Sequence, residues 1–255
     1  MMGQDLFNLA GRVALVTGGS KGLGKAMARA LAQAGADVVI CSRHEDELKP
    51  ALNEILDGTG RKGRYVVADM TRRDDVKRLA QVVLEQMGRV DILVNNAGTN
   101  RPQTIDKVTD EDWDAVLEIN LSSAMALTRA LVPQMKERRW GRVIHITSVL
   151  GFTSKEGRNS YSATKSALIG LARASALDLG PFGITVNCIA PGPFLTDLPM
   201  SLLSEAEKKV FAERTALLRW GEPKELMGPV LLLASDAGSY ISGTTLVVDG
   251  GWLAR

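Results

Sequence analysis

Tyr161 and Lys165, four residues apart in Tyr-Ser-Ala-Thr-Lys, and Ser148 upstream of them are the side chains best suited to chemistry. Four residues span about one helical turn, so the phenol and the ammonium lie on one helix face. A free phenol has a pKa of about 10, and a nearby cation lowers it by favouring the phenolate. We therefore expect Tyr161 to act as a general acid or base while Ser148 hydrogen-bonds a substrate oxygen. Because this spacing also occurs on solvated helix faces, the pair alone does not identify an enzyme.

A glycine-rich segment follows the first apolar run of the chain, with Gly18, Gly22 and Gly24 in its turn. The pattern predicts a strand, a glycine loop and a helix that begins near Gly22. Glycines let the backbone approach a pyrophosphate closely, and the N–H groups and dipole of the helix favour an anion. The spacing departs from G-x-G-x-x-G, whose last position would fall on Met27. A tight turn without a ligand is the alternative interpretation.

Six motifs occur in one order along the chain: Thr17-Gly18-x3-Gly22-x-Gly24, Asn95-Asn-Ala-Gly98, Asn120, Ser148, Tyr161-x3-Lys165 and Pro191-Gly192. In this order and spacing the chain resembles the short-chain dehydrogenase/reductase family, from about Leu9 to the C-terminus. The resemblance implies a nicotinamide-dependent oxidoreductase on a single Rossmann-like domain, here residues 1–255, and often a homotetramer. It also implies that residues 194–220 form a lid over the substrate.

The apolar pattern independently predicts an α/β fold. A chain of 255 residues with 45% hydrophobic and 24% charged residues suits one globular domain. Short, nearly continuous apolar runs predict about seven parallel strands buried on both faces, at 13–17, 38–41, 65–68, 92–94, 143–147, 184–189 and 246–248. Helical periodicity occurs between them, at 24–34, 45–56, 74–87, 111–138, 160–179 and 223–234. Right-handed crossovers would build a doubly wound sheet flanked by helices, with ligands at the carboxyl ends of the strands.

Charge and composition argue against several other classes of protein. The formal net charge is only +2, and the basic cluster at 136–139 is typical of a solvated surface, so we expect no nucleic-acid partner. Residues 1–10 lack the pattern of a signal peptide and no apolar run approaches a membrane span, which predicts a cytoplasmic protein without a membrane partner.

The two cysteines and two histidines do not predict a metal site or a disulfide. Cys41 and Cys188 lie in strand-like runs, where a reduced cysteine behaves as a small apolar residue. His44 and His145 are not spaced as metal ligands. We expect His145 to be a hydrogen-bonded core or interface residue rather than a catalyst.

The end of the second predicted strand indicates which nicotinamide cofactor binds. An NAD enzyme usually places an acidic residue there, to accept hydrogen bonds from the ribose hydroxyls. Here the sequence is Ser42-Arg43-His44, with no carboxylate before Glu45. A guanidinium can hold a ribose 2′-phosphate through paired hydrogen bonds, so Arg43, with Lys21 as a second cation, predicts NADP rather than NAD. The alternative is that both side chains are merely solvated.

The resemblance implies further roles. Lys165 would hydrogen-bond the nicotinamide ribose, and Asn120 would hold a water that links this lysine to solvent. Asp69 would bind the adenine amine, although it could instead cap the helix after Met70. Phe194 would contact the nicotinamide amide through its backbone, with Thr196 nearby.

The candidate site residues form two sets, one for catalysis and one for cofactor binding. The catalytic set is Asn120, Ser148, Tyr161 and Lys165. The cofactor-binding set is Gly18, Ser20, Lys21, Gly22, Leu23, Gly24, Ser42, Arg43, Asp69, Met70, Asn96, Ala97, Gly98, Tyr161, Lys165, Pro191, Gly192, Phe194 and Thr196.

The sequence is least informative about the substrate. Segments at 219–223, 233–237 and 248–251 look like both gluconate 5-dehydrogenases and 3-oxoacyl-carrier-protein reductases. The latter typically present two arginines to the carrier; Arg139 matches one, but Phe182 stands at the other position, and Thr99-Asn-Arg-Pro102 differs from their usual Thr-Arg-Asp. We therefore favour a small ketone or alcohol, such as a polyol or a sugar acid like gluconate, with the carrier-protein reductase as the alternative. A non-catalytic NADP-binding sensor or scaffold is a third hypothesis, which the presence of all four catalytic candidates disfavours.

Overall fold

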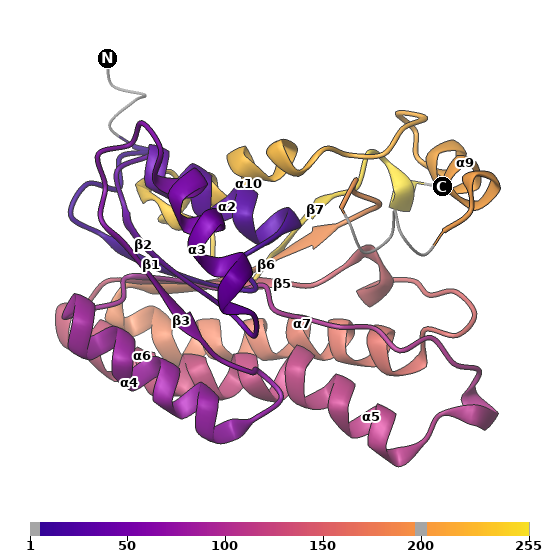
Figure 1. Ribbon diagram of the computed structural model, residues 1–255, viewed down its shortest axis with the longest axis horizontal. Helices are drawn as coiled ribbons and strands as arrows, with labels where there is room; N and C mark the ends of the chain where they lie inside the picture. The colour runs from indigo at the N-terminus through magenta and orange to yellow at the C-terminus, as the bar shows by residue number, and fades with distance from the viewer. Residues whose placement is uncertain (1–5, 197–202, 255) are drawn as a thin grey trace.

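A parallel sheet of seven strands forms the centre of the folded molecule (Figure 1). The computed structural model describes residues 6–196 and 203–254. The strand order is β3-β2-β1-β4-β5-β6-β7, and every neighbouring pair is parallel. The bounds are β1 Val13–Thr17, β2 Asp37–Ser42, β3 Gly63–Val67, β4 Ile92–Asn95, β5 Gly141–Ile146, β6 Ile184–Pro191 and β7 Thr245–Val248. The predicted Rossmann-like, doubly wound fold is therefore confirmed.

Helices occupy the stretches between the strands, mostly where the periodicity predicts them. Their bounds are α2 Gly22–Gln33, α3 Glu45–Leu56, α4 Arg73–Met87, α5 Asp110–Leu117, α6 Ser123–Arg138, α7 Asn159–Leu179, α9 Glu205–Arg214 and α10 Met227–Ala234. Two features were not predicted. A π-helical turn at Glu118–Ser122 separates α5 from α6, and α9 forms in a polar stretch that buries no residue and lacks a helical apolar pattern. Local capping explains the start of α9, because Ser204 and Glu207 form a reciprocal capping box.

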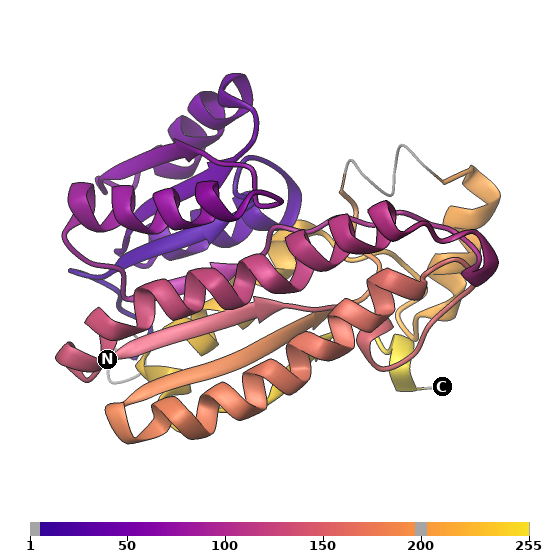
Figure 2. The same ribbon diagram turned by 90° about the horizontal axis from the view of Figure 1, so that it is seen from below.

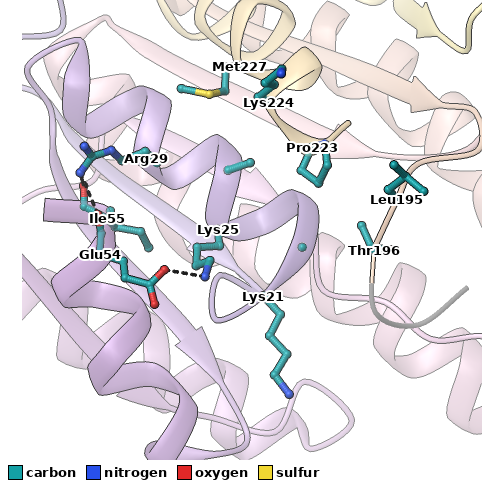
Figure 3. Close-up of a pocket in the computed structure, with 12 residues that line it drawn as sticks. Lys21, Lys25, Arg29, Glu54, Ile55, Leu195, Thr196, Pro223, Lys224 and Met227 are labelled. Carbon is teal, nitrogen blue, oxygen red and sulfur yellow. Dashed lines mark hydrogen bonds and ion pairs between the residues drawn. The ribbon is translucent and has the colours of Figure 1, made fainter. Parts of the chain in front are cut away.

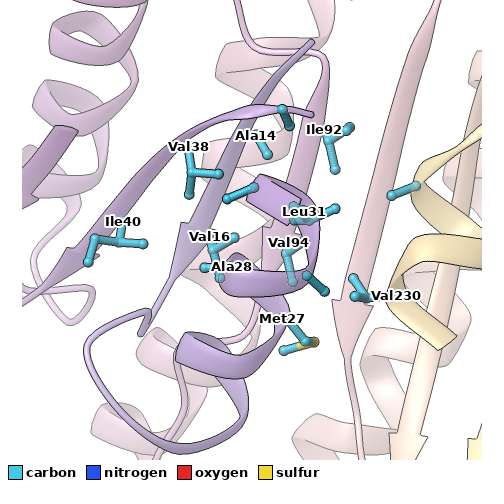
Figure 4. Close-up of a cluster of buried hydrophobic side chains, with 14 of the residues drawn as sticks. Ala14, Val16, Met27, Ala28, Leu31, Val38, Ile40, Ile92, Val94 and Val230 are labelled. Carbon is cyan, nitrogen blue, oxygen red and sulfur yellow. The ribbon is translucent and has the colours of Figure 1, made fainter. Parts of the chain in front are cut away.

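Alternation along the strands creates two core layers, one on each face of the sheet. Ala14 and Val16 of β1 pack in one cluster with residues of α2, α3 and α10. Figure 4 shows part of it, with Met27 and Leu31 of α2 and Val230 of α10. Leu15 instead packs with residues of α4, α6 and α7. Successive side chains of a strand point to opposite faces, so both faces need apolar residues when helices cover both. This is why the strands read as nearly continuous apolar runs.

One helix among the described residues is long and apolar enough to cross a membrane by length and composition alone, at Asp110–Arg138. The apolar pattern of the sequence did not predict it. Half of its apolar window is buried inside the protein, and α6 packs against α4 while α5 packs against α7. Buried core helices pass the same test, and the buried Leu127 and Leu131 place this helix in the core beneath the sheet.

The strand order reverses direction at β1, which pairs with β2 on one side and with β4 on the other. Crossovers leave β1 and β4 toward opposite sides, which opens a crevice at their carboxyl ends. Gly18 follows β1 and Asn96 follows β4, while Ser148 lies just beyond the end of β5. The fold therefore brings these predicted residues to one edge of the sheet.

Candidate active site

Ser148, Tyr161 and Lys165 meet between the end of β5 and the first turns of α7. Ser148 precedes the short 3₁₀ turn Val149–Gly151, and its hydroxyl accepts a hydrogen bond from the Leu150 N–H at 3.1 Å. Lys165 Nζ lies 5.5 Å from the centre of the Tyr161 ring. It donates to the carbonyl of Ile146, the last residue of β5, at 2.8 Å. The sheet thus holds the ammonium beside the phenol.

The pKa of Tyr161 is raised above its ordinary value, mainly by burial, while a hydrogen bond with Ser148 and the charge of Arg158 oppose the rise. We expected Lys165 to lower this pKa, and the structure differs. The ammonium of Lys165 is directed at a backbone carbonyl, and burial lowers its own pKa to about 8. Desolvation of the phenol therefore outweighs the neighbouring positive charges, and Tyr161 is protonated at neutral pH.

Asn120 is brought to Lys165 by the π-helical turn. Its Oδ1 accepts from the Thr99 N–H at 2.8 Å, and its Nδ2 donates to the Thr99 carbonyl and to Thr164 Oγ1, both at 3.0 Å. A Cβ on Gly98 would stand 3.1 Å from Asn120 Oδ1 and 3.5 Å from Lys165 Nζ. Asn120 is buried and joins the loop after β4 to α7, beside the lysine. Figure 2 shows α5 and the π-helical turn running alongside α7, which they contact.

The glycine loop between β1 and α2 is shaped for an anion. Gly18 and Gly22 have φ of 63° and 50°, which favours glycine. A Cβ on Gly24 would come within 2.1 Å of the Gly18 carbonyl oxygen, so only glycine allows this helix–strand approach. Lys21 is the N-cap residue of α2 without a side-chain cap, and the first turn contains no acidic residue. The N-terminal amides of α2 are thus left for a ligand, which fits the pyrophosphate of a dinucleotide.

Thr17 ties this loop to the end of β4, a role that the sequence analysis missed. Its Oγ1 accepts from the N–H groups of Asn96 and Ala97 at 3.0 and 2.9 Å. In return, Asn96 Nδ2 donates to the carbonyls of Thr17 and Gly18 at 2.9 and 3.1 Å. The side chain of Asn96 therefore braces the glycine loop. A threonine at the last position of a strand that enters a glycine turn was the only local signal.

On the predicted adenosine side, Arg43 is exposed and Ser42 ends β2. Asp69 does not cap the next helix, whose N-cap residue is Arg72. Its Oδ1 instead accepts from the N–H and the hydroxyl of Thr71 at 2.9 and 2.8 Å, because a short side chain can close a turn on its own backbone. Met70 is buried in the core layer that α4, α6 and α7 cover, where its side chain packs against apolar neighbours.

Glu47, from the first turn of α3, reaches the glycine loop and was not among the candidates. Its Oε1 lies 2.7 Å from Lys21 Nζ, and its Oε2 accepts from Ser20 Oγ at 3.4 Å. The Lys21 hydrogen bond is the main cause that holds the pKa of Glu47 below its ordinary value. A carboxylate therefore stands beside two residues predicted to bind the cofactor. The sequence spacing between Lys21 and Glu47 offered no sign of this contact.

The segment after β6 passes over the start of α2. Gly192 packs against the backbone of Asp249, where a Cβ would stand only 2.7 Å from Asp249 Cα. Phe194 is buried in the core layer that α2, α3 and α10 cover, where its side chain packs against apolar neighbours. The Thr196 methyl lies 3.2 Å from a Cβ placed on Gly22. Of the predicted lid 194–220, residues 197–202 lie outside the described residues.

A cavity of about 580 Å³ borders the glycine loop, between α2 and the 3₁₀ turn Pro223–Leu226 that precedes α10 (Figure 3). Lys21, Gly22 and Thr196 line one end of it. Its basic side chains have internal partners: Lys25 pairs with Glu54 at 2.7 Å, and Arg29 donates to the last carbonyls of α3. The cavity therefore adjoins the predicted pyrophosphate site.

The structure places His145 in the core, as expected, and buries both cysteines. His145 is fully buried in β5, with its Nδ1 3.1 Å from Asn95 Nδ2. Burial, helped by the charge of Lys165, lowers its pKa to about 4. Cys41 and Cys188 are buried and free. Within residues 6–196 and 203–254, no group of three His, Cys, Asp or Glu side chains is placed to hold a metal ion.

Comparisons with known proteins agree with this geometry. The model of the short chain dehydrogenase family matches residues 12–207. The 3-oxoacyl-[acyl-carrier-protein] reductase of Aquifex aeolicus is 37% identical over 95% of this chain and 98% of its own. The 2-dehydro-3-deoxy-D-gluconate 5-dehydrogenase of Dickeya dadantii is 38% identical over 98% and 99%. The crystal structure of a gluconate 5-dehydrogenase from Burkholderia cenocepacia, in complex with NADP and tartrate, superimposes with a TM-score of 0.93 and 35% identity, covering 99% of each chain.

Proposed function

Since the chain belongs to the short-chain dehydrogenase family of oxidoreductases, we propose that it interconverts a secondary alcohol and a ketone with NADP(H), and that Tyr161 is the general acid and base. The observation that carries this proposal is the cluster of Ser148, Tyr161 and Lys165 at the carboxyl edge of the sheet. A sensor or scaffold of the same fold would have no need to keep this cluster together with Asn120.

Each residue of the cluster has a defined task in this mechanism. The bound nicotinamide supplies or accepts the hydride. Ser148 donates a hydrogen bond to the substrate oxygen and orients it. Tyr161, protonated at neutral pH, gives its proton to that oxygen during reduction and takes it back during oxidation. Lys165 stays positioned by the Ile146 carbonyl, and Asn120 keeps the Gly98 loop against it.

NADP is the cofactor we propose. The N-terminal amides of α2 would hold its pyrophosphate, Arg43 and Lys21 its 2′-phosphate, and Asp69 its adenine. NADP in the Burkholderia cenocepacia neighbour supports this assignment. The proposal fails if steady-state kinetics give a clearly higher kcat/KM with NAD than with NADP.

A small sugar acid or polyol is the substrate class that we favour. Arg158, one helical turn before Tyr161, has a partly desolvated guanidinium that acts electrostatically on the phenol. Among the described residues, its Nη1 is buried without a hydrogen-bond partner. A buried N–H group without a hydrogen-bond partner is costly, and a substrate carboxylate would satisfy it. The tartrate bound to the Burkholderia cenocepacia neighbour is such an acid.

A carrier-protein reductase is the second candidate, and one contact favours it. Phe182 replaces one of the two expected arginines, but Lys136 Nζ lies 4.5 Å from the centre of its ring. Arg139 is close by, donating to the Pro181 carbonyl at 2.9 Å. Two cations therefore remain at the place where an acidic carrier would dock.

A substrate panel followed by NADPH absorbance separates these candidates. We expect oxidation of NADPH with 5-ketogluconate at a higher kcat/KM than with acetoacetyl-coenzyme A, and gluconate as a substrate in the reverse direction. A strong preference for the thioester would instead support the function of a carrier-protein reductase. Turnover of neither, with NADP bound, would leave the sugar-acid proposal refuted.

The organisation of the whole protein is proposed on the same basis. We propose that residues 1–255 act as one domain with residues 194–220 as the substrate lid, in a cytoplasmic homotetramer without nucleic-acid or membrane partners. Leu177 of α7 is 80% exposed, an apolar side chain that a partner subunit would cover. Light scattering should give four times the chain mass of 27.4 kDa, and a monomer at micromolar concentration would exclude the tetramer. Cell fractionation tests the location.

A further inference from the structure

The carboxylate of Glu47 stands at the place where a cofactor 2′-phosphate would be held. It is 2.7 Å from the ammonium of Lys21, one of the two cations that we assign to this phosphate. It also accepts a hydrogen bond from the hydroxyl of Ser20, at 3.4 Å. The structure thus already contains an anion on the donors of the glycine loop. Glu47 comes from α3 and not from the end of β2, where the acidic residue of NAD enzymes usually lies.

This position has opposite consequences for the two cofactors. A 2′-phosphate that approaches Lys21 must either share the ammonium with Glu47 or displace the Glu47 carboxylate. The phosphate and the carboxylate also repel each other at short range. A free ribose 2′-hydroxyl carries no charge and can donate a hydrogen bond to the same carboxylate. Glu47 therefore disfavours NADP and favours NAD, whereas Arg43 acts in the other direction.

We propose that Glu47 is a specificity-determining residue that limits the preference for NADP over NAD by occupying Lys21 and Ser20. The inference rests on the proposed use of a nicotinamide cofactor at the glycine loop, and not on which of the two cofactors is preferred. It predicts that both are bound, with an affinity ratio set by the balance between Arg43 and Glu47. The low pKa of Glu47 keeps its charge present throughout the neutral range.

The test is a pair of variants, Glu47→Gln and Asp46→Asn, each of which removes one negative charge from the first turn of α3. Asp46 precedes Glu47 in the same turn and is exposed. Dissociation constants would be measured by calorimetry for NADP, NAD, 2′,5′-ADP and 5′-AMP. The last two are fragments that differ only in the 2′-phosphate.

We expect Glu47→Gln to tighten the binding of NADP and 2′,5′-ADP on the order of three- to tenfold, and to leave the binding of NAD and 5′-AMP unchanged or weaker. The gain should shrink as salt is added, because it is electrostatic. Asp46→Asn should change the NADP/NAD ratio by less than about twofold, since its carboxylate is solvated.

Two results would overturn the inference. An unchanged NADP/NAD ratio in Glu47→Gln would show that the carboxylate does not act on the phosphate, and weaker NADP binding would show that it instead holds Lys21 in place. Glu47→Ala provides a second variant if the glutamine form is unstable. A wild-type protein that prefers NAD would refute the proposed NADP preference alone, because the ratio should still rise when Glu47 is neutralised.

Discussion

The acid–base side chain illustrates how burial competes with charge. Tyr161 has cations on two sides, yet its pKa is raised because desolvation is the largest effect. A protonated phenol suits the reduction of a ketone, in which the residue must first give a proton. The spacing of tyrosine and lysine predicted that the two groups meet, but not which of these opposing effects is larger.

Replacing this phenol tests its role directly. Tyr161→Phe removes the transferable proton and keeps the ring, so kcat should fall on the order of 10²- to 10⁴-fold while cofactor binding is preserved. Tyr65→Phe is the matched control, since the Tyr65 hydroxyl donates a hydrogen bond to Glu45 at the surface. Turnover by Tyr161→Phe close to the wild-type rate would exclude this tyrosine as the acid and base.

A substitution of Arg158 tests whether this residue recognises the negative charge of the substrate. If it pairs with a carboxylate, Arg158→Gln should weaken inhibition by tartrate on the order of tenfold and leave inhibition by threitol, its uncharged tetrol analogue, unaffected. Arg158→Lys should recover part of the loss. Equal effects on tartrate and threitol would assign Arg158 a structural role.

Arg43, which is exposed, is the residue that we propose to set the cofactor preference. Arg43→Asp replaces a phosphate-binding cation with a group that accepts hydrogen bonds from ribose hydroxyls, so the ratio of kcat/KM for NADP and NAD should invert. Kinetics with both cofactors measure this. A ratio that does not move would mean that Arg43 is only solvated.

At the scale of elements, the ends of β1 and β4 are joined by one hydroxyl. Thr17 is buried and its Oγ1 accepts two backbone hydrogen bonds from the loop after β4. The π-helical turn plays a similar part for Asn120, because an extra residue in a helical turn redirects a side chain. Both devices hold loops of the site on rigid secondary structure.

Removing the Thr17 hydroxyl should loosen this junction. In Thr17→Val two partly buried N–H groups lose their acceptor, so the free energy of unfolding should fall by about 1–3 kcal/mol and cofactor binding should weaken. The matched control is Thr185→Val, since Thr185 Oγ1 is buried and has no hydrogen-bond partner in the part of the chain that the structure describes, so its loss should be neutral or stabilising. Chemical denaturation measures both. Equal destabilisation of the two variants would contradict the bracing role.

At the scale of the whole molecule, the buried His145 couples stability to pH. Its folded pKa is about 4, below an unfolded value of about 6.5. Between these values the unfolded chain binds a proton that the folded chain does not, so folding loses stability as pH falls from about 6.5 to about 4. The full difference corresponds to about 3 kcal/mol.

Thermal unfolding between pH 4 and 7.5 tests this coupling. His145→Gln should flatten the decline in Tm toward acid pH relative to the wild type, because the titrating group is gone. His44→Gln is the control, as His44 is exposed. Identical pH profiles for His145→Gln and the wild type would show that another group causes the acid sensitivity.

Sequence alone determined the succession of strands and helices along the chain, the glycine loop and the pairing of Tyr161 with Lys165, because these depend on local periodicity, on backbone conformations that glycine permits and on spacing within one helix. It also placed Ser148 at the carboxyl edge of the sheet, because this serine follows a predicted strand. The tertiary structure decided which side chains from distant elements share a space. Glu47 pairs with Lys21, and Asn120 and Lys165 both lie beside Gly98. The Lys165 ammonium donates its hydrogen bond to the Ile146 carbonyl instead of lowering the pKa of the Tyr161 phenol. No pattern of neighbouring residues encodes these contacts, since packing of α3, the π-helical turn and β5 sets their distances and their desolvation.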